Sequence, residues 1–183
     1  RDLVAVTFGE FIASHLRAVE FLVRATRIPV GRRFKTVVTS SAGYTLDKTY
    51  YQTIKGMVTP LDILEPGGTL IVASECSEGF GSHEFREAQA KLVTLGPERF
   101  LATLTAKTLA EVDEWQTEMQ LKAMRVGRIQ LYAPGLDAEE QAITGVEIID
   151  SVDQAIAAAV ARHGDPAVAV IPEGPYVIPV AGA

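Results

Sequence analysis

Apolar residues recur at intervals of three and four positions through the first part of the chain. Residues with this spacing share one face of a helix, so the pattern predicts a mostly helical segment over residues 2–27. Pro29 and Gly31 end that segment, and they also interrupt the basic stretch from Arg24 to Lys35, which we interpret as a solvated connection. The recurring positions are Phe8, Phe11, Ile12, His15, Leu16, Val19 and Leu22.

From residue 36 onward, short apolar runs alternate with segments of helical length. The expected strands are 36–41, 69–74, 128–133, 146–150 and 167–172. Helices are expected at about 47–64, 82–95, 97–107 and 137–143, the first with Asp47 as N-cap and a break at Pro60. A further helix is expected to start from a capping box at Thr108 and Glu111 and to run to Val126. A last helix is expected to be capped by Ser151 and to end before Gly164. This alternation predicts a Rossmann-like α/β fold of three layers, with a mostly parallel sheet covered by helices on both faces.

Composition narrows the class of protein. The net charge is −6, and Lys and Arg do not cluster among aromatic residues, which argues against a nucleic-acid partner. No apolar run approaches the roughly 18 residues that a membrane helix needs, so no membrane association is expected. A single cysteine excludes an internal disulfide framework and predicts a reducing, cytoplasmic location. Since the chain starts with Arg1, we expect it to be part of a longer or processed protein.

Ligands of parallel α/β folds bind at the carboxyl ends of the strands, which here places candidate loops at 40–47, 74–82 and 133–137. The loop 74–82 contains glycines and opens a helix, as a phosphate-binding loop would, but it carries two glutamates and matches no phosphate-binding motif. A tight turn that requires glycine is the competing interpretation. Cys76 in this loop is either a nucleophile or, as is usual for such cysteines, a small buried residue.

The helix expected around residues 50–58 has a polar and an apolar face. At 100° per residue, Tyr51, Gln52 and Lys55 share one sector, and an opposing stripe contains Tyr50, Ile54, Met57 and Val58. A ring, an amide and an ammonium group together suit a flat anionic ligand. An ordinary amphipathic helix with a solvated face explains the same spacing.

Trp115 is the only tryptophan and is flanked by Asp113, Glu114 and Gln116. Such a residue is more often part of a core or a domain contact than of a binding site. The histidines at positions 15, 83 and 163 do not have the spacing of metal ligands, so no metal-binding residues are predicted in this chain.

Four segments together resemble the C-terminal domain of the nickel-dependent lactate racemase family. They are TSSAGYTLDKTYYQTIKGM, LEPGGTLIVASECSEGFGS, VDEWQTEMQ and VIPEGPYV, and the resemblance extends from about His15 to Tyr176. It implies a 2-hydroxyacid racemase or epimerase, an isomerase that uses a nickel pincer nucleotide built on a pyridinium ring. That cofactor takes hydride from C2 of the hydroxy acid and returns it to either face.

The resemblance assigns Gln52 and Lys55 to the catalytic cleft and Tyr51 and Trp115 to the cofactor-binding surface. The family's tethering lysine, nickel ligand and catalytic histidines belong to an N-terminal domain that no part of this chain resembles. We therefore expect residues 1–35 to be a helical connection from that missing domain, residues 36–183 to be the C-terminal α/β domain, and the isolated chain to be inactive. A non-catalytic domain that binds a nucleotide or a partner protein is the alternative.

Overall fold

The computed structural model describes residues 3–182 and contains an open five-stranded parallel sheet. The strand order is β5-β4-β3-β2-β6, and all neighbouring strands are parallel. The strands are β2 (Phe34–Ser40), β3 (Leu64–Ala73), β4 (Arg128–Tyr132), β5 (Glu147–Ile148) and β6 (Val168–Ile171). The chain moves outward from β2 to β5 and then returns to the other side of β2, which confirms the predicted fold class.

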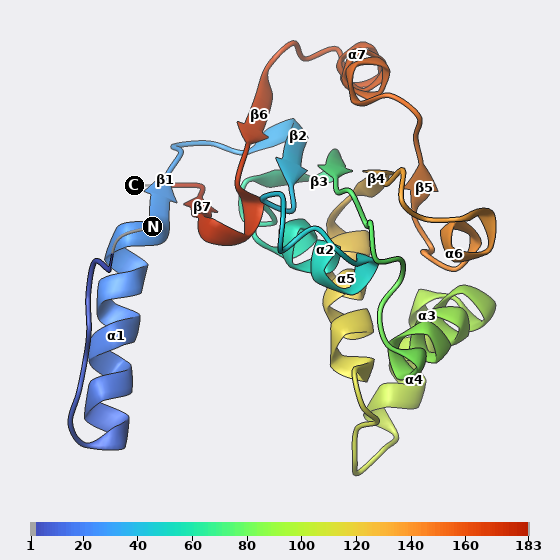
Figure 1. Ribbon diagram of the computed structural model, residues 1–183. Coiled ribbons are helices and arrows are strands. Elements are labelled where there is room, and N and C mark those ends of the chain that lie inside the picture. The colour runs from blue at the N-terminus through green and yellow to red at the C-terminus, as the bar shows by residue number, and fades with distance from the viewer. Residues whose placement is uncertain (1–2, 183) are drawn as a thin grey trace.

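Helices cover both faces of this sheet (Figure 1). The helices of the main body are α2 (Tyr50–Val58), α3 (His83–Leu95), α4 (Pro97–Thr105), α5 (Glu114–Val126), α6 (Ala138–Ala142) and α7 (Val152–His163). One face packs against α2 and α5, and the other packs against α7. Successive residues of a strand point to opposite faces, so Val37 belongs to the core beneath α2 whereas Val38 belongs to the core beneath α7.

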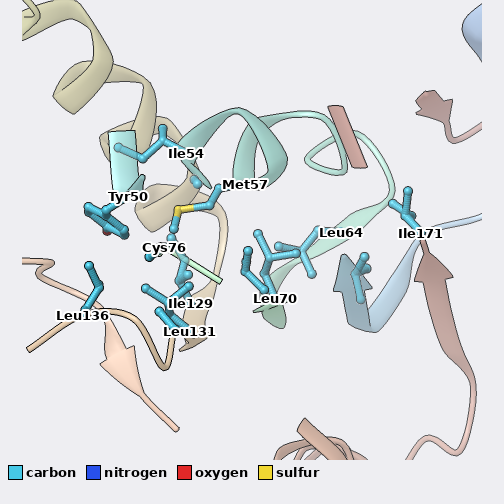
Figure 2. Close-up of a cluster of buried hydrophobic side chains, with 14 of the residues drawn as sticks. Tyr50, Ile54, Met57, Leu64, Leu70, Cys76, Ile129, Leu131, Leu136 and Ile171 are labelled. Carbon is cyan, nitrogen blue, oxygen red and sulfur yellow. The ribbon is translucent and has the colours of Figure 1, made fainter. Parts of the chain in front are cut away.

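The larger core lies between the sheet and α2 (Figure 2). Tyr50, Ile54 and Met57 of α2 are fully buried there, together with Leu70 of β3 and Leu131 of β4. This is the apolar stripe predicted for the helix, with the difference that Val58 is only half-buried. Burying each large apolar side chain contributes about 1.5–3 kcal/mol, which fixes the orientation of α2 and turns its other face outward.

The loops at the carboxyl edge of the sheet pack directly against one another. Cys76 N donates to Asp47 O at 2.7 Å, and Gly135 N donates to Glu75 O at 2.9 Å. A Cβ atom at Gly135 would lie only 2.4 Å from Cys76 O. The three candidate loops therefore lie together, and their own backbones contact one another closely.

The N-terminal helix, α1 (Phe11–Thr26), begins later than the sequence pattern indicated. Glu10 caps it by accepting hydrogen bonds from Ile12 N and Ala13 N at 3.1 and 2.8 Å, and Gly9 adopts a φ of 143° that no helix allows. The predicted helical segment 2–27 was thus wrong for residues 3–10, and residue 2 lies outside the described part of the chain.

Two short strands were not predicted. In this pair, β1 (Arg27–Pro29) lies parallel to β7 (Ile178–Val180), which follows the 3₁₀ turn η1 (Gly174–Tyr176). The two strands bring both ends of the described chain together beside α1 (Figure 1). Across residues 3–182, no helix is long and apolar enough to cross a membrane.

Three predicted boundaries were wrong. Thr49, rather than Asp47, caps α2 by accepting from Gln52 N. Strand β3 begins at Leu64 rather than at Thr69, and its first part contains an irregularity where the register against β2 shifts and Gly67 has a φ of 79°. Helix α5 begins at Glu114 instead of Thr108. The buried Glu114 carboxylate accepts from Lys107 Nζ at 2.7 Å and from Glu111 N at 3.1 Å. These bonds hold the segment between Lys107 and Glu114 in a non-helical conformation.

Candidate functional site

Helix α2 presents three of the predicted site residues on its outward face. Gly56 allows this helix to approach β2 closely, since a Cβ atom there would lie 2.9 Å from Ser40 O. With the apolar stripe held in the core, Tyr51 and Gln52 are half-buried and Lys55 is exposed. The structure therefore places all three side chains on one face of one helix, as the spacing indicated.

Gln52 and Lys55 form a polar pair on that face. Lys55 Nζ donates to Gln52 Oε1 at 2.7 Å. This hydrogen bond occupies the amide oxygen, so the amide N–H groups of Gln52 and the remaining ammonium hydrogens of Lys55 are the donors of the pair that a ligand could use. Among residues 3–182, no carboxylate lies within 4.0 Å of the Lys55 ammonium group. The pair can accordingly donate hydrogen bonds to an external carboxylate.

Tyr51 connects this polar pair to the aromatic part of the site. Its ring lies edge-on to Phe85 at 5.2 Å and to Trp115 at 6.1 Å between centroids. The Lys55 ammonium group lies 6.0 Å from the Tyr51 ring centroid. Burial raises the pKa of the Tyr51 phenol, and the nearby negative charge of Asp113 raises it further, so the hydroxyl is neutral at neutral pH.

Trp115 lies in the first turn of α5, and its side chain is 51% exposed, so it is not a core residue. It borders a hollow of about 270 Å³ that is also lined by Lys107, Leu109 and Glu114. Leu109 and Val112 on the preceding connection are 83% and 67% exposed. The surface around Trp115 thus combines exposed apolar side chains with the charged side chains of Lys107 and Glu114.

The glycine-bearing loop 74–82 is a packed turn. Its N–H groups are engaged internally, since Glu78 N donates to Lys48 O at 2.7 Å and Gly79 N donates to Cys76 O at 2.9 Å. The loop also closes the start of α2, where Tyr50 N donates to Gly79 O. Cys76 is buried, and burial raises the pKa of its thiol. This geometry favours the tight-turn interpretation over a phosphate site.

The histidines lie on separate elements. His163 Nε2 lies 3.0 Å from Thr69 Oγ1, and the exposed His83 lies 3.2 Å from Glu87. Within the described range, His, Cys, Asp and Glu residues form no group of three or more that could hold a metal ion. The described residues therefore do not fit a nickel site.

Two residues of this region were missed by the sequence analysis. Ser82 Oγ donates to Asp113 Oδ2 at 2.6 Å, which joins the start of α3 to the start of α5 beside Tyr51. Asp113 was noted only as a neighbour of Trp115. The two residues are separated by 31 positions and match no motif, so only the fold reveals their contact.

The fold and the site define a Rossmann-like α/β domain whose helices α2 and α5 present a cationic and aromatic surface. The model of the family described as the lactate racemase C-terminal domain matches residues 32–179. This chain belongs to that family, which confirms the resemblance drawn from its four motifs.

Similar proteins extend beyond this domain. A lactate racemase of Lactiplantibacillus plantarum is 26% identical over 181 residues, which cover 97% of this chain and 42% of that protein. A lactate racemase of Thermoanaerobacterium thermosaccharolyticum is 34% identical over 77 residues, or 18% of its length. The chain therefore spans less than half the length of these curated relatives. The structure of the T. thermosaccharolyticum lactate racemase apoprotein superimposes on this chain with a TM-score of 0.78 at 21% sequence identity. The match covers 91% of this chain and 40% of the other, and it shows that the two have the same fold.

Proposed function

We propose that this chain is the C-terminal domain of a 2-hydroxyacid racemase or epimerase that acts by hydride removal and return on a nickel pincer nucleotide. Residues 1–35 connect it to an N-terminal domain that carries the cofactor, and residues 36–183 supply part of the cleft between the two domains. Hydride transfer belongs to the cofactor. The contribution of this chain is to bind and orient the substrate and to shield it from water.

The observation that carries the proposal is the Lys55–Gln52 pair. A lysine that is hydrogen-bonded to a neutral amide, with no carboxylate within 4.0 Å among residues 3–182, retains its charge for an external anion. Every 2-hydroxy acid has a carboxylate next to its reacting carbon. Lys55 would neutralise that group and the Gln52 amide would orient it, because hydrogen bonds to charged groups are shorter and stronger than neutral ones.

The aromatic residues complete the surface. The ring of Tyr51 lies 6.0 Å from the Lys55 ammonium group and edge-on to the half-exposed indole of Trp115, and the two perpendicular rings would offer aromatic surface to a pyridinium-type ring. The exposed Leu109 lines the same hollow as Trp115. A self-sufficient binding domain would have a polar surface here, so the exposed apolar side chains support a shared cleft that a second domain covers.

A racemisation assay on the protein that joins this chain to its N-terminal domain tests the proposal. With nickel cofactor loaded, we expect interconversion of the D and L forms of lactate or of another acid in a panel of 2-hydroxy acids. Gln52→Ala and Lys55→Ala should abolish most of that activity. Gln154→Ala, an exposed glutamine on α7 at the opposite face of the sheet, is the matched control and should leave it unchanged.

Two results would change the conclusion. If the loaded protein converts no acid, the non-catalytic alternative, a domain that binds a nucleotide or a partner protein, replaces the racemase. If it is active and insensitive to both substitutions, the racemase stands and the assignment of Gln52 and Lys55 is wrong. A cytoplasmic location stays a prediction from the single cysteine, and fractionation of the source cells checks it.

A further inference from the structure

Residues 3–8 have the sequence of a strand but lie in no sheet of the described chain. The run LVAVTF is apolar and rich in β-branched residues, and Gly9 follows it as a turn residue. Among residues 3–182 the strands form two sheets, and neither sheet contains this segment. Its large apolar side chains are between 73% and 100% exposed, namely Leu3, Val4, Val6 and Phe8. Exposed apolar side chains on an unpaired, extended backbone indicate a strand whose neighbours lie elsewhere.

Helix α1 has a polar face, which identifies the face that a partner would cover. Arg17 and Arg24 both pair with Glu20, at 3.4 and 3.6 Å, and all three side chains are exposed. At 100° per residue, six large apolar residues fall within a sector of about 140° that lies away from these charges. This apolar stripe contains Phe11, Ile12, Leu16, Val19, Leu22 and Val23. Such a width is typical of a helix that packs on a core, yet no residue of α1 is buried.

The segment and the apolar stripe form one continuous surface. Residues 3–8 run back along α1 (Figure 1). Val4 of the segment lines a hollow of about 360 Å³ together with Val19 and Leu22 of the stripe. A strand followed by a helix that lies beside it is the repeating unit of α/β domains, in which the strand belongs to a sheet and the helix covers that sheet. Within the described residues, the helix of this unit is present without the sheet that it would cover.

The length of the relatives indicates what covers this surface. The match to the L. plantarum lactate racemase covers 97% of this chain, which leaves out too few residues to omit α1, and only 42% of that protein. More than half of that relative thus lies outside the match. A second copy of this chain would supply at most one further strand, whereas sheets usually contain about 4–6 strands. A sheet in a separate domain of the same protein supplies the neighbours that the segment lacks.

We propose that residues 3–26 are a strand–helix unit of the N-terminal domain, with residues 3–8 inserted in its sheet and the apolar stripe of α1 packed on the face of that sheet. The boundary between the two domains therefore lies after α1 instead of at residue 35. Residues 3–26 belong to the fold of the other domain and do more than connect to it. The inference rests on the proposed function only for the presence of an N-terminal domain and not for its chemistry.

Hydrogen exchange followed by mass spectrometry tests the strand. In the protein that joins this chain to its N-terminal domain, the amides of residues 4–8 should exchange at least about a hundredfold more slowly than in this chain alone, because they gain hydrogen bonds in a sheet. Residues 70–73 of the buried strand β3 are the internal reference and should stay protected in both proteins. Equally rapid exchange of residues 4–8 in the two proteins would overturn the proposal.

Proline substitutions distinguish a strand from a segment that is only covered. Proline has no N–H, so it breaks a ladder hydrogen bond where the native N–H is paired. The N–H groups of the adjacent Val6 and Thr7 point to opposite sides of a strand, so at least one of Val6→Pro and Thr7→Pro should lower the Tm of the two-domain protein by more than about 5 °C. In this chain alone neither should shift the Tm by more than about 1 °C, because the segment is unpaired.

Alanine variants at the same two positions are the matched controls. Val6→Ala and Thr7→Ala keep the N–H and shorten the side chain, so in the two-domain protein they should lower the Tm by less than the more disruptive proline variant does. Proline variants that are no more disruptive than the alanine variants would overturn the assignment of residues 3–8 to a strand.

Oligomeric state and turnover separate the remaining explanations. If this chain alone forms a dimer by light scattering and residues 4–8 become protected as that dimer forms, a second copy covers the unit and the proposal is wrong. If the two-domain protein protects residues 4–8 but racemises no 2-hydroxy acid, the proposed function fails and the domain assignment stands. If it racemises while residues 4–8 exchange freely, the proposed function stands and the domain assignment fails.

Discussion

The ring of Tyr51 stands perpendicular to the indole of Trp115, with 6.1 Å between their centroids. Edge-to-face pairs of this kind add about 0.5–1.5 kcal/mol beyond the area that they bury. The pair links α2 to α5 at the surface while the core links them underneath, so a ligand that contacts Lys55 also meets an aromatic surface whose position is set by α5.

Lys55→Ala in the two-domain protein should lower kcat/KM by roughly 10- to 100-fold, the cost of losing one hydrogen bond to a charged group. Because Lys55 is exposed, the free energy of unfolding should change by less than about 0.5 kcal/mol. Steady-state kinetics and urea unfolding measure the two effects. Lys122→Ala, an exposed lysine on α5 paired with Glu118, is the control. Equal losses of activity and stability would mean that Lys55 is structural.

Gly81→Ala should destabilise the chain and move Tyr51. The φ of Gly81 is 129°, and the added Cβ would lie 2.9 Å from Tyr51 Cβ, so strain and overlap combine to cost about 2–4 kcal/mol. Gly67→Ala provides the comparison, because its φ is 79° but nothing lies within 4 Å of the added atom. Urea unfolding of both variants isolates the overlap. A loss no larger in Gly81→Ala than in Gly67→Ala would show that Tyr51 moves aside freely.

The sheet and the polar face of α2 were predictable because their signals are local. Strands of a parallel sheet are buried on both faces and form continuous apolar runs, such as the one from Leu70 to Ala73, which the sequence displays directly. The face that carries Lys55 follows from helical periodicity alone. These features need no knowledge of which distant segments meet.

The contacts that the sequence did not reveal are all distant along the chain. Pairing of β1 with β7 joins residues 27–29 to residues 178–180, and each strand is too short to show a pattern. The late start of α5 depends on Lys107 and on the burial of Glu114. A capping motif at Thr108 gave the opposite indication, since local helix propensity is a weak preference that tertiary contacts override.

Cys76 should resist alkylation in the folded chain. Burial raises the pKa of its thiol, so a smaller fraction is thiolate at any pH below that value, and the side chain is also inaccessible. At pH 8 we expect the reaction with iodoacetamide to be at least about tenfold slower than in the same chain unfolded in urea, and to accelerate as the pH rises. Mass spectrometry follows the single cysteine. Rapid modification of the folded chain would instead favour the interpretation of Cys76 as a nucleophile.

The apolar residues of α1 should matter for stability only when the N-terminal domain is present. None of the residues of this helix is buried, and Leu16 and Leu22 are 60% and 55% exposed. In this chain, Leu16→Ala should therefore change the free energy of unfolding by less than about 0.5 kcal/mol. The fully buried Leu70 provides the matched comparison, and Leu70→Ala should cost about 2–5 kcal/mol.

The same substitution in the two-domain protein gives the contrast. If the N-terminal domain covers α1, Leu16 becomes a buried side chain, and Leu16→Ala should then cost about 2 kcal/mol or more in unfolding measured by urea. The family match begins at residue 32, after α1, whereas the match to the L. plantarum lactate racemase covers 97% of the chain. The family match therefore does not include α1. A negligible cost in both proteins would remove α1 from the interface and leave the apolar surface around Trp115 as the place where the two domains meet.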